Sequence, residues 1–336
     1  MALLLVEQNF HMTTKHPSAT QVLGLPTETQ MPAHFFSHKE SYMTHKLHRR
    51  KLIGGAIASA ASLATATPVT RLAERPLVIG QIALSFHVAS AAVVRTLLTQ
   101  AGVAHTVVEQ PHEKIYEMLG KGEIDMAVSA WLPGSHGAYV APYEKDLIKL
   151  GVLYEPYAIW GVPDYVPATE VAALHDLAKP EVAARMTKLI QGIGPGAGIS
   201  RFSREIVARY KLDALGYEFR NGTLDECVDA FERALTEHRW AVVPLWHPQY
   251  LHSVHRIRAL NDPEHLLRGK DAATLVVRRD AAALLPLDLL ARLAKLTLGN
   301  AAVAEMDFMI SRDKFAPLAA AQRWMETHPS DVAAWG

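Results

Sequence analysis

Short apolar runs alternate with amphipathic segments over most of the chain, and this alternation limits the fold to a mixed α/β architecture. Strands are predicted at residues 77–82, 105–109 and 126–130, with helices at 88–100 and 112–119 between them. Strands separated by helices of this length are typical of a parallel sheet with helices on both faces. The sequence therefore predicts a doubly wound parallel sheet in the first part of the chain.

A second unit of the same kind follows. Its predicted strands lie at 158–162, 189–193, 216–219 and 240–245, and its helices at 200–210 and 223–237. A strand at 273–278 and three helical stretches between 286 and 326 complete the chain. We expect a bilobed clamshell, with two doubly wound sheets joined by a hinge. The expected boundaries are 76–153 for the first part of lobe I, 154–255 for lobe II, and 256–336 for the return to lobe I with the C-terminal helices.

The N-terminal region predicts export. Basic residues 46–51 include the pair Arg49-Arg50, and a mildly apolar Gly/Ala-rich stretch follows at 52–60. Small residues at 64–66 resemble a cleavage site, so residues 43–66 are predicted to be a twin-arginine-like signal peptide and the protein to be periplasmic. The alternative is a cytoplasmic amphipathic leader. Because a signal peptide begins a chain, residues 1–42 are predicted to be disordered or a misassigned start.

Composition narrows the possible partners and reactive groups. Lysine plus arginine equal aspartate plus glutamate at 34 each, so we expect no nucleic-acid partner. Cys227 is the only cysteine, which excludes an intramolecular disulfide, and its amphipathic surroundings predict a buried thiol. The histidines 247, 252 and 255 match no zinc-binding spacing, so we expect no metal and no cofactor. The arginines of helix 200–210 are expected to form a solvated face.

Two short segments contain a tryptophan directly after an apolar run and a proline two residues later. They are WLPGSH at 131–136 and WHPQY at 246–250. The proline prevents each strand from simply continuing, so Trp131 and Trp246 are predicted at strand ends. Ligands bind open α/β sheets at the carboxyl ends of the strands, so both rings are expected to face one cleft. Aromatic faces bind a quaternary ammonium, which has no N–H donors, through cation–π attraction.

Four segments occur together and in order: GEID at 122–125, AWLPGSH at 130–136, GIGPGAGI at 192–199 and VPLWHPQY at 243–250. Their combination resembles the substrate-binding proteins of ABC importers for glycine betaine, proline betaine and choline, which are periplasmic binding proteins of a type II-like fold. The resemblance spans residues 77–310. It implies a monomeric, non-enzymatic receptor that captures a quaternary amine or a related zwitterion and delivers it to the permease and ATPase subunits of an importer.

The resemblance also assigns roles to residues. Trp131 and Trp246 match cage tryptophans, and Gly198 and Ile199 match residues whose backbone N–H groups receive a ligand carboxylate. A helix that begins near residue 200 agrees with this role, because its first N–H groups are unpaired and carry partial positive charge. Ala197 stands where some relatives have a further cage tryptophan. The cage is therefore expected to be completed by Tyr250, by Phe86 with His87 beside it, or by Trp160; the alternative is a looser cage suited to a bulkier head group.

Three other functions remain open at this point. One is a secreted α/β hydrolase acting on a small cationic substrate, although no Gly-x-Ser-x-Gly motif occurs and no catalytic residue can be named. The second is a receptor for a different solute, such as histidine, and the third is a ligand-sensing domain.

Overall fold

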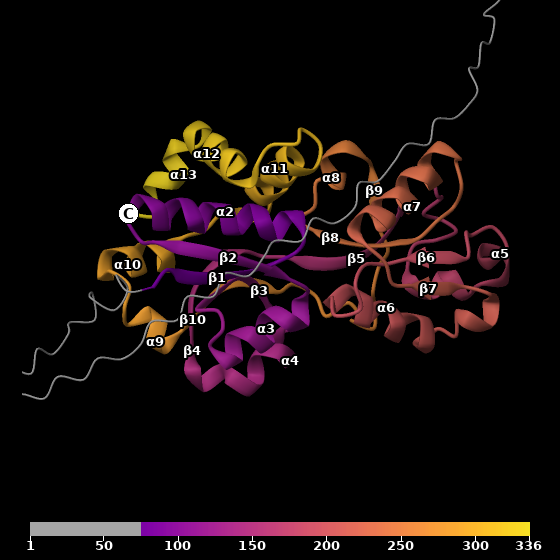
Figure 1. Ribbon diagram of the computed structural model, residues 1–336. Helices are drawn as coiled ribbons and strands as arrows, with labels where there is room; N and C mark the ends of the chain where they lie inside the picture. The colour runs from indigo at the N-terminus through magenta and orange to yellow at the C-terminus, as the bar shows by residue number, and fades with distance from the viewer. Residues whose placement is uncertain (1–74) are drawn as a thin grey trace, which may run out of the picture. The chain divides into compact units, whose positions relative to one another are not determined.

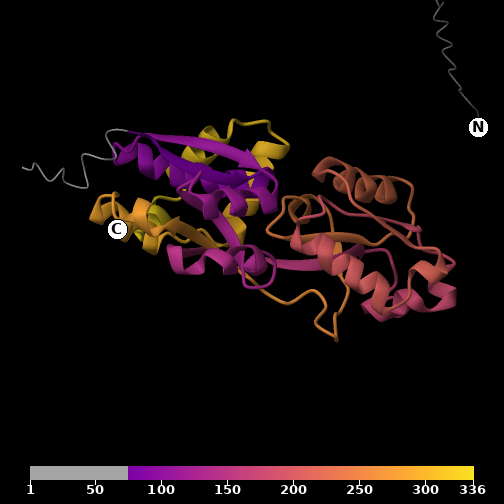
Figure 2. The same cartoon turned by 60° about the horizontal axis from the view of Figure 1, so that its bottom comes forward.

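The computed structural model describes residues 75–336, so the predicted signal peptide and the residues before it lie outside the described part. Within that part, the indigo and magenta start of the chain and the yellow C-terminal helices form one lobe, and the middle of the chain forms another (Figures 1 and 2). The predicted bilobed α/β class is confirmed. No helix among the described residues is long and apolar enough to span a bilayer.

The first lobe contains two stretches of the chain. The first stretch comprises β1 (Leu77–Ile82), α2 (Ser85–Gln100), β2 (His105–Gln110), α3 (His112–Lys121), β3 (Met126–Leu132), α4 (Gly137–Val140), a 3-10 turn (Ala141–Asp146) and β4 (Leu147–Tyr154). The second stretch comprises β10 (Ala272–Arg278), α9 (Arg279–Ala282), α10 (Leu287–Lys295), α11 (Gly299–Ser311), α12 (Pro317–Thr327) and α13 (Pro329–Ala333). Helix α2 lies between the sheet and α11 and α12, while α3 covers the other face of the sheet (Figure 1).

The sheet of the first lobe is mixed rather than purely parallel as the sequence predicted. Its strand order is β2-β1-β3-β10-β4. Strand β1 pairs in parallel with β2 and β3, but β10 is antiparallel to both of its neighbours. The reason is topological: β4 carries the chain out into the second lobe, and β10 brings it back in the opposite direction.

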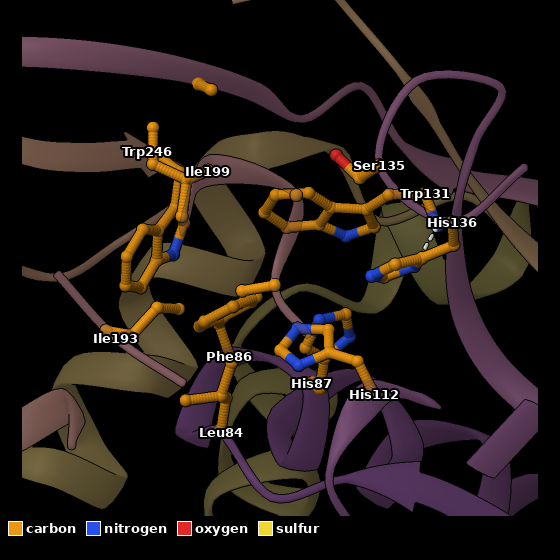
Figure 3. A pocket seen from close by; sticks show the side chains of 13 residues that line it. Leu84, Phe86, His87, His112, Trp131, Ser135, His136, Ile193, Ile199 and Trp246 are labelled. Carbon is orange, nitrogen blue, oxygen red and sulfur yellow. Dashed lines mark hydrogen bonds between the residues drawn. The ribbon is translucent and has the colours of Figure 1, made fainter. Parts of the chain in front are cut away.

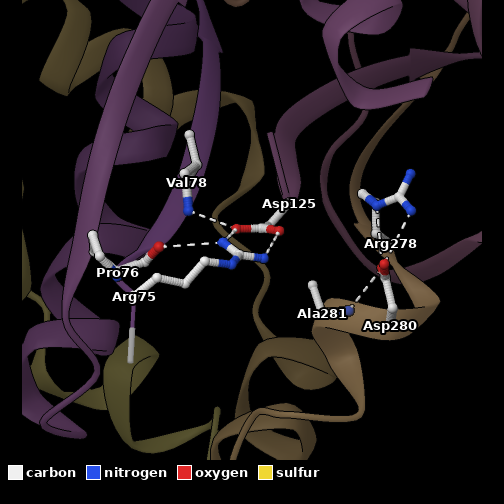
Figure 4. A network of polar contacts seen from close by, with 7 residues as sticks. All are labelled: Arg75, Pro76, Val78, Asp125, Arg278, Asp280 and Ala281. Atoms are coloured by element: carbon white, nitrogen blue, oxygen red, sulfur yellow. Dashed lines mark hydrogen bonds and ion pairs between the residues drawn. The ribbon is translucent and has the colours of Figure 1, made fainter. Parts of the chain in front are cut away.

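A buried carboxylate fixes the amino ends of β1 and β3 (Figure 4). Asp125 accepts the backbone N–H of Val78 over 2.8 Å and two hydrogen bonds from the guanidinium of Arg75 over 2.6 and 2.8 Å. The backbone N–H of Arg278, at the end of β10, donates to the carbonyl of Asp125 over 2.9 Å. These bonds join the amino ends of β1 and β3 to the carboxyl end of the antiparallel β10 at one edge of the sheet.

The second lobe has an antiparallel sheet and a separate parallel pair of strands. Its elements are β5 (Tyr157–Pro163), a 3-10 turn (Leu174–Ala178), α5 (Pro180–Ala183), β6 (Leu189–Gln191), α6 (Gly198–Arg209), a 3-10 turn (Asp213–Leu215), β7 (Glu218–Arg220), α7 (Leu224–Thr236), β8 (Val243–His247), α8 (Leu251–Val254) and β9 (Ile257–Ala259). The three-stranded sheet has the order β8-β5-β9, and β6 pairs with β7. Since β9 pairs with β5, the second lobe continues beyond the boundary expected at residue 255.

The capping box predicted at the start of α7 is present. The Thr223 hydroxyl accepts the backbone N–H of Glu226 over 3.1 Å, and the Glu226 carboxylate accepts the backbone N–H of Thr223 over 2.6 Å. This reciprocal pair satisfies two of the N–H groups that a helix start leaves free. Cys227 lies in the same helix and is fully buried, and burial raises the pKa of its thiol to about 12.

Candidate functional site

A small pocket lies where the two lobes meet, beyond the carboxyl ends of several strands. Its free volume is about 20 Å³. The lining residues come from both lobes: Leu84, Phe86, His87, His112, Trp131, Ser135 and His136 from the first, and Ala158, Ile193, Ala197, Gly198, Ile199 and Trp246 from the second (Figure 3). The position agrees with the rule that open α/β sheets bind ligands at the carboxyl ends of their strands.

Three aromatic rings from three elements form one side of the pocket. Trp131 lies near the end of β3, Trp246 near the end of β8, and Phe86 in the first turn of α2. The Phe86 ring centroid is 5.4 Å from Trp131 and 5.3 Å from Trp246, so the two indoles lie on either side of the phenyl ring (Figure 3). Trp131 is 7% exposed and Trp246 1%. The structure therefore brings together rings that are 115 positions apart in the sequence.

The start of α6 forms another wall of the pocket. Ala197 is the N-cap residue, and Gly198 and Ile199 are the first two helical residues. Their backbone N–H groups have no intrahelical acceptor, because the first turn of any helix leaves them free. The first turn of α6 carries no acidic side chain to satisfy them. This end of the helix therefore presents donors and a partial positive charge to the pocket.

The two lobes are in direct contact beside this helix start. A Cβ at Gly198 would lie 2.6 Å from the Ser135 hydroxyl and 2.9 Å from the Ser135 Cα. Arg201, one turn into α6, donates hydrogen bonds to the Ser135 carbonyl and, over 3.1 Å, to the Tyr139 hydroxyl of the first lobe. Arg201 was predicted to be part of a solvated face, and this prediction is wrong. The sequence pattern of the helix gave no sign of the facing loop.

The loop that carries Ser135 and His136 is itself tightly held. The carboxylate of Asp271 accepts the backbone N–H groups of Gly134 and Ser135 over 2.6 and 3.0 Å. His136 Nδ1 accepts the backbone N–H of Trp131 over 2.9 Å. The turn after β3 is therefore anchored to the segment through which the chain returns to the first lobe.

Three buried histidines line the side of the pocket away from Trp246. The ring centroids of His87, His112 and His136 form a triangle with sides of 5.2, 6.0 and 6.1 Å. Burial lowers the pKa of His112 to about 4, and Arg201 contributes in the same direction. Burial likewise lowers the pKa of His87 and of His136 well below the usual range. All three rings are therefore neutral near pH 7.

Of the candidate residues from the sequence, the pocket contains Trp131, Trp246, Phe86, His87, Ala197, Gly198 and Ile199. It does not contain Tyr250, whose ring lies 5.0 Å from the guanidinium of Arg312, nor Trp160, which is fully buried and donates its indole N–H to Ser203 over 2.8 Å. Sequence reasoning missed His112 and His136 as lining residues. His136 stands in the WLPGSH segment, but no local signal identifies His112.

The histidines 247, 252 and 255 lie outside this pocket. His247 and His252 stack with their centroids 3.6 Å apart, and His255 contacts the carboxylate of Glu232 over 3.0 Å. Among residues 75–336, no group of three or more His, Cys, Asp or Glu side chains is arranged to hold a metal ion.

Comparisons with known proteins agree with this architecture. The glycine betaine/carnitine transport binding protein GbuC of Listeria monocytogenes is 24% identical over 162 residues, which cover 47% of this chain and 52% of that protein. The match thus spans about half the length of this relative.

Solved structures share the fold. Lactococcal OpuAC in its closed form with glycine betaine has a TM-score of 0.68 at 22% identity, with 78% of this chain and 99% of that chain covered. ProX from Borrelia burgdorferi has a TM-score of 0.69 at 20% identity, with coverages of 78% and 96%. A choline-binding protein of an ABC transporter, in complex with choline, has a TM-score of 0.68 at 19% identity, with coverages of 77% and 91%.

The sequence model of one family matches residues 75–327, which is most of the chain. The resemblance drawn from the four sequence segments is thereby confirmed. The protein belongs to the family of substrate-binding domains of ABC-type glycine betaine transport systems.

Proposed function

We propose that the protein is an extracytoplasmic receptor that captures a glycine betaine-like zwitterion and delivers it to the permease of an ABC importer. The observation that carries this proposal is the convergence of Trp131 and Trp246, from different lobes, on a pocket that also contains the free N–H groups of α6. The ammonium head lies against the three aromatic rings. The carboxylate accepts hydrogen bonds from Gly198 and Ile199.

Micromolar affinity requires contacts to both the ammonium and the carboxylate end of the ligand. A desolvated cation–π contact contributes about 2 kcal/mol, so three rings supply less than the roughly 8 kcal/mol that micromolar binding needs. Hydrogen bonds to a charged acceptor add about 1.5–3 kcal/mol each. A zwitterion that contacts both the rings and the helix start therefore reaches an affinity that a simple cation does not.

Binding also requires movement. The free volume of about 20 Å³ holds about one water, whereas a cavity of about 150 Å³ lined by apolar side chains holds benzene. A trimethylammonium group is similar in size to benzene. The lobes therefore open to admit the ligand and close around it, and the contacts from both lobes make the closed state depend on the ligand.

Further parts of the proposal concern the cellular context. The protein is exported through the signal predicted at 43–66, works as a monomer in the periplasm, and catalyses no reaction. Its partners are the permease and ATPase subunits of the importer.

The proposal is tested by calorimetry and thermal-shift measurements on residues 75–336 with glycine betaine, choline, carnitine, proline and histidine. A matched ligand pair isolates the role of charge: 3,3-dimethylbutanoate has the shape of glycine betaine but carries carbon in place of the ammonium nitrogen. We expect glycine betaine to bind at least about 30-fold more tightly than this isostere, since one desolvated cation–π contact alone contributes about 2 kcal/mol. Equal binding of the pair, or no response to any of these solutes, contradicts the proposal.

A further inference from the structure

A second pocket lies within the second lobe, away from the pocket between the lobes. Its volume is about 460 Å³, within the range of about 300–1,000 Å³ that ligand pockets usually have. We propose that it is a second binding site, for a tetrahedral oxyanion such as inorganic phosphate or the phosphate group of a larger molecule. The proposal goes beyond the proposed function and does not depend on it. The pocket is called the arginine pocket below, and it is lined by Asp164, His247, His252, His255, Arg256, Ile257 and Arg258.

The arginine pocket and the pocket between the lobes lie on opposite faces of one sheet. Neighbouring residues of a strand point to opposite faces. In β8, Trp246 lines the pocket between the lobes (Figure 3), and the next residue, His247, lines the arginine pocket. Their partners in β5 are Ala158 and Tyr157, and Ala158 also lines the pocket between the lobes. The sheet therefore separates a ligand in the arginine pocket from the ligand between the lobes.

Two guanidinium groups in the arginine pocket have no carboxylate partner. Among residues 75–336, neither Arg256 nor Arg258 is ion-paired, and the nearest candidate, the Asp164 carboxylate in the same pocket, lies more than 4.0 Å from their nitrogens. Other arginines of this lobe pair with a carboxylate, namely those at 185, 209, 220, 239 and 268. The pocket therefore keeps an excess of positive charge that an anion can neutralise.

Arg258 is partly buried and has an unused donor. Its Nη2 donates to the carbonyl of Val166 over 2.8 Å, but its Nε is buried and has no hydrogen-bond partner among the described residues. Burial lowers the pKa of Arg258, because the charged form loses solvation here without a compensating anion. Buried polar groups are normally hydrogen bonded, and desolvated charges are normally paired. An oxyanion bound to Arg258 supplies both partners at once.

Arg256 adds further donors to the same pocket. It directly precedes β9, two positions before Arg258, and both side chains line the arginine pocket. Arg256 is exposed, and its guanidinium makes no hydrogen bond to any of residues 75–336. A guanidinium presents its N–H groups in a planar fork that matches the spacing of phosphate oxygens. Two such forks in one pocket are suited to one oxyanion with several acceptor oxygens.

The histidines contribute a neutral donor rather than charge. His252 donates its Nε2–H to the carbonyl of Trp246 over 3.0 Å, since a carbonyl can only accept. His247 stacks between His252 and Tyr157, with centroid distances of 3.6 and 4.7 Å, and makes no hydrogen bond to a described residue. Burial lowers the pKa of His247 and lowers that of His252 to about 4, so both rings are neutral near pH 7. His247 therefore has a free N–H, and the charge of the pocket comes from the arginines.

This set of donors favours a phosphate group over a carboxylate. A carboxylate offers two oxygens in one plane, whereas a phosphate ester offers three acceptor oxygens and a charge of about −1.5 to −2 at pH 7. The donors of Arg256, Arg258 and His247 come from three side chains on two strand ends, so they require acceptors in more than one plane. The assignment is therefore a tetrahedral oxyanion.

Calorimetry with inorganic phosphate at pH 7.5 tests the site. Saturating glycine betaine is included in one series, because it blocks the start of α6, which also attracts anions. We expect one phosphate per protein, with an affinity that glycine betaine changes less than twofold, since the arginine pocket belongs to one lobe. The affinity should fall as salt rises from about 10 to about 150 mM, where the screening length shortens from about 30 to about 8 Å. Acetate should bind about tenfold more weakly than phosphate.

Variants assign the binding to the arginine pocket. Arg256→Gln and Arg258→Gln are each expected to weaken phosphate binding about tenfold, because each removes charged hydrogen-bond donors. Asp164→Asn removes the opposing charge and should strengthen it about threefold. Arg323→Gln changes an exposed arginine of α12 in the first lobe and is the matched control with no effect. Arg256 and Asp164 make no hydrogen bonds among residues 75–336, so these two variants decide the matter even where Arg258→Gln does not fold.

Three probes separate the possible sources of the phosphate group. Inorganic phosphate and glycerol 3-phosphate present it in solution, and vesicles of phosphatidylglycerol present it on a membrane. Sedimentation with the vesicles that is lost in Arg256→Gln would assign a lipid headgroup, whereas binding of the soluble probes alone would assign a free phosphate compound.

The remaining outcomes overturn the second site. They are no saturable binding of any of the three probes, phosphate binding that survives Arg256→Gln and Asp164→Asn unchanged, or displacement of phosphate by glycine betaine. Each leaves the proposed function intact. If glycine betaine itself does not bind, the proposed function fails, and the phosphate titrations of the variants still decide the arginine pocket.

Discussion

Asp307 of α11 accepts the backbone N–H of Tyr250 over 2.9 Å, which ties a C-terminal helix of the first lobe to the segment directly after Trp246. The same carboxylate accepts the Ser311 hydroxyl over 3.1 Å and is fully buried. Burial raises the pKa of Asp307 to about 6. A contact between the lobes thus depends on a carboxyl group that gains and loses its proton near neutral pH.

Replacing Asp307 with Asn tests this raised pKa. The folded pKa lies above the unfolded value, so the folded state holds the proton more strongly, and stability falls as the pH rises from about 4 to about 6. The Asn amide keeps the acceptor for Tyr250 but cannot ionise. We therefore expect Asp307→Asn to match the unaltered protein at pH 4 and to exceed its free energy of unfolding at pH 7.5 by up to about 3 kcal/mol.

Urea unfolding at the two pH values provides the measurement. The control is Asp313→Asn, which changes an exposed carboxylate beyond the end of the same helix. Its effect on the free energy of unfolding is expected to be the same at both pH values. The measured quantity is the free energy of unfolding of Asp307→Asn minus that of the unaltered protein. A difference that is smaller at pH 7.5 than at pH 4 contradicts the raised pKa of Asp307.

Gly198 permits the close approach of the lobes. Its Cβ position would lie within 3 Å of three atoms of Ser135, one of them the backbone Cα. Forcing extra atoms into a packed contact costs about 1–3 kcal/mol. Because this contact exists only when the lobes touch, Gly198→Ala is expected to weaken ligand binding by roughly 5- to 150-fold. Small-angle scattering should show the ligand-saturated variant remaining more open.

The glycine-rich loop offers its own control for this experiment. A Cβ at Gly194 meets no atom within 4 Å, so Gly194→Ala is expected to bind as the unaltered protein does. Equal affinity of the Gly198 and Gly194 variants would show that the lobes do not close through this contact.

Much of the fold was predictable because its strands and helices are long and periodic. The start of α2 was not: the helix begins at Ser85 rather than at residue 88, and Leu84 at its N-cap offers no capping side chain. Strand β4 was missed as well. It contains Gly151, which weakens a strand signal, and this glycine lets backbone carbonyls at the end of α10 approach to about 3 Å from its Cβ position. Contacts of this kind join segments that are far apart in the chain, so they give no signal in the local sequence.

The same distinction applies to the pocket. Trp131 and Trp246 were found because each follows an apolar run and precedes a proline, a pattern that is local. His112 enters the pocket because α3 packs beside the loop after β3, whereas the Tyr250 ring lies outside it, beside the guanidinium of Arg312. The antiparallel direction of β10 likewise follows from the path of the chain between the lobes. A short segment of the sequence does not determine that path.

Arg201 is expected to act as a latch between the lobes. It donates to the Ser135 carbonyl and the Tyr139 hydroxyl of the first lobe, and to the Gly196 carbonyl of its own lobe over 2.6 Å. Loss of hydrogen bonds made by a charged group costs about 1.5–3 kcal/mol each, less where solvent shares the site. We expect Arg201→Met to weaken ligand binding about tenfold, mainly through faster dissociation in stopped-flow measurements.

Two further variants make the latch test specific. Arg201→Lys keeps the charge but cannot reach several acceptors at once, so it should restore little of the lost affinity. Arg209→Met removes an arginine with a side chain 59% exposed from the end of the same helix and should leave dissociation unchanged. An unchanged dissociation rate in Arg201→Met would exclude the latch.

Trp246 provides the most direct test of the aromatic site. Its indole N–H has no hydrogen-bond partner among the described residues, so the ring contributes through its face rather than through a polar contact. Trp246→Ala removes a desolvated cation–π contact worth about 2 kcal/mol or more and is expected to weaken glycine betaine binding at least 30-fold, abolishing the ligand-induced thermal shift and fluorescence change. Trp246→Phe keeps an aromatic face and should retain most of the affinity. Trp335→Phe, a change in the C-terminal region where Trp335 packs near Trp324, should alter stability alone. If binding to Trp246→Ala stays within a factor of two, the second lobe contributes no ring to the site, and the ammonium head must be held by Trp131 and Phe86 of the first lobe.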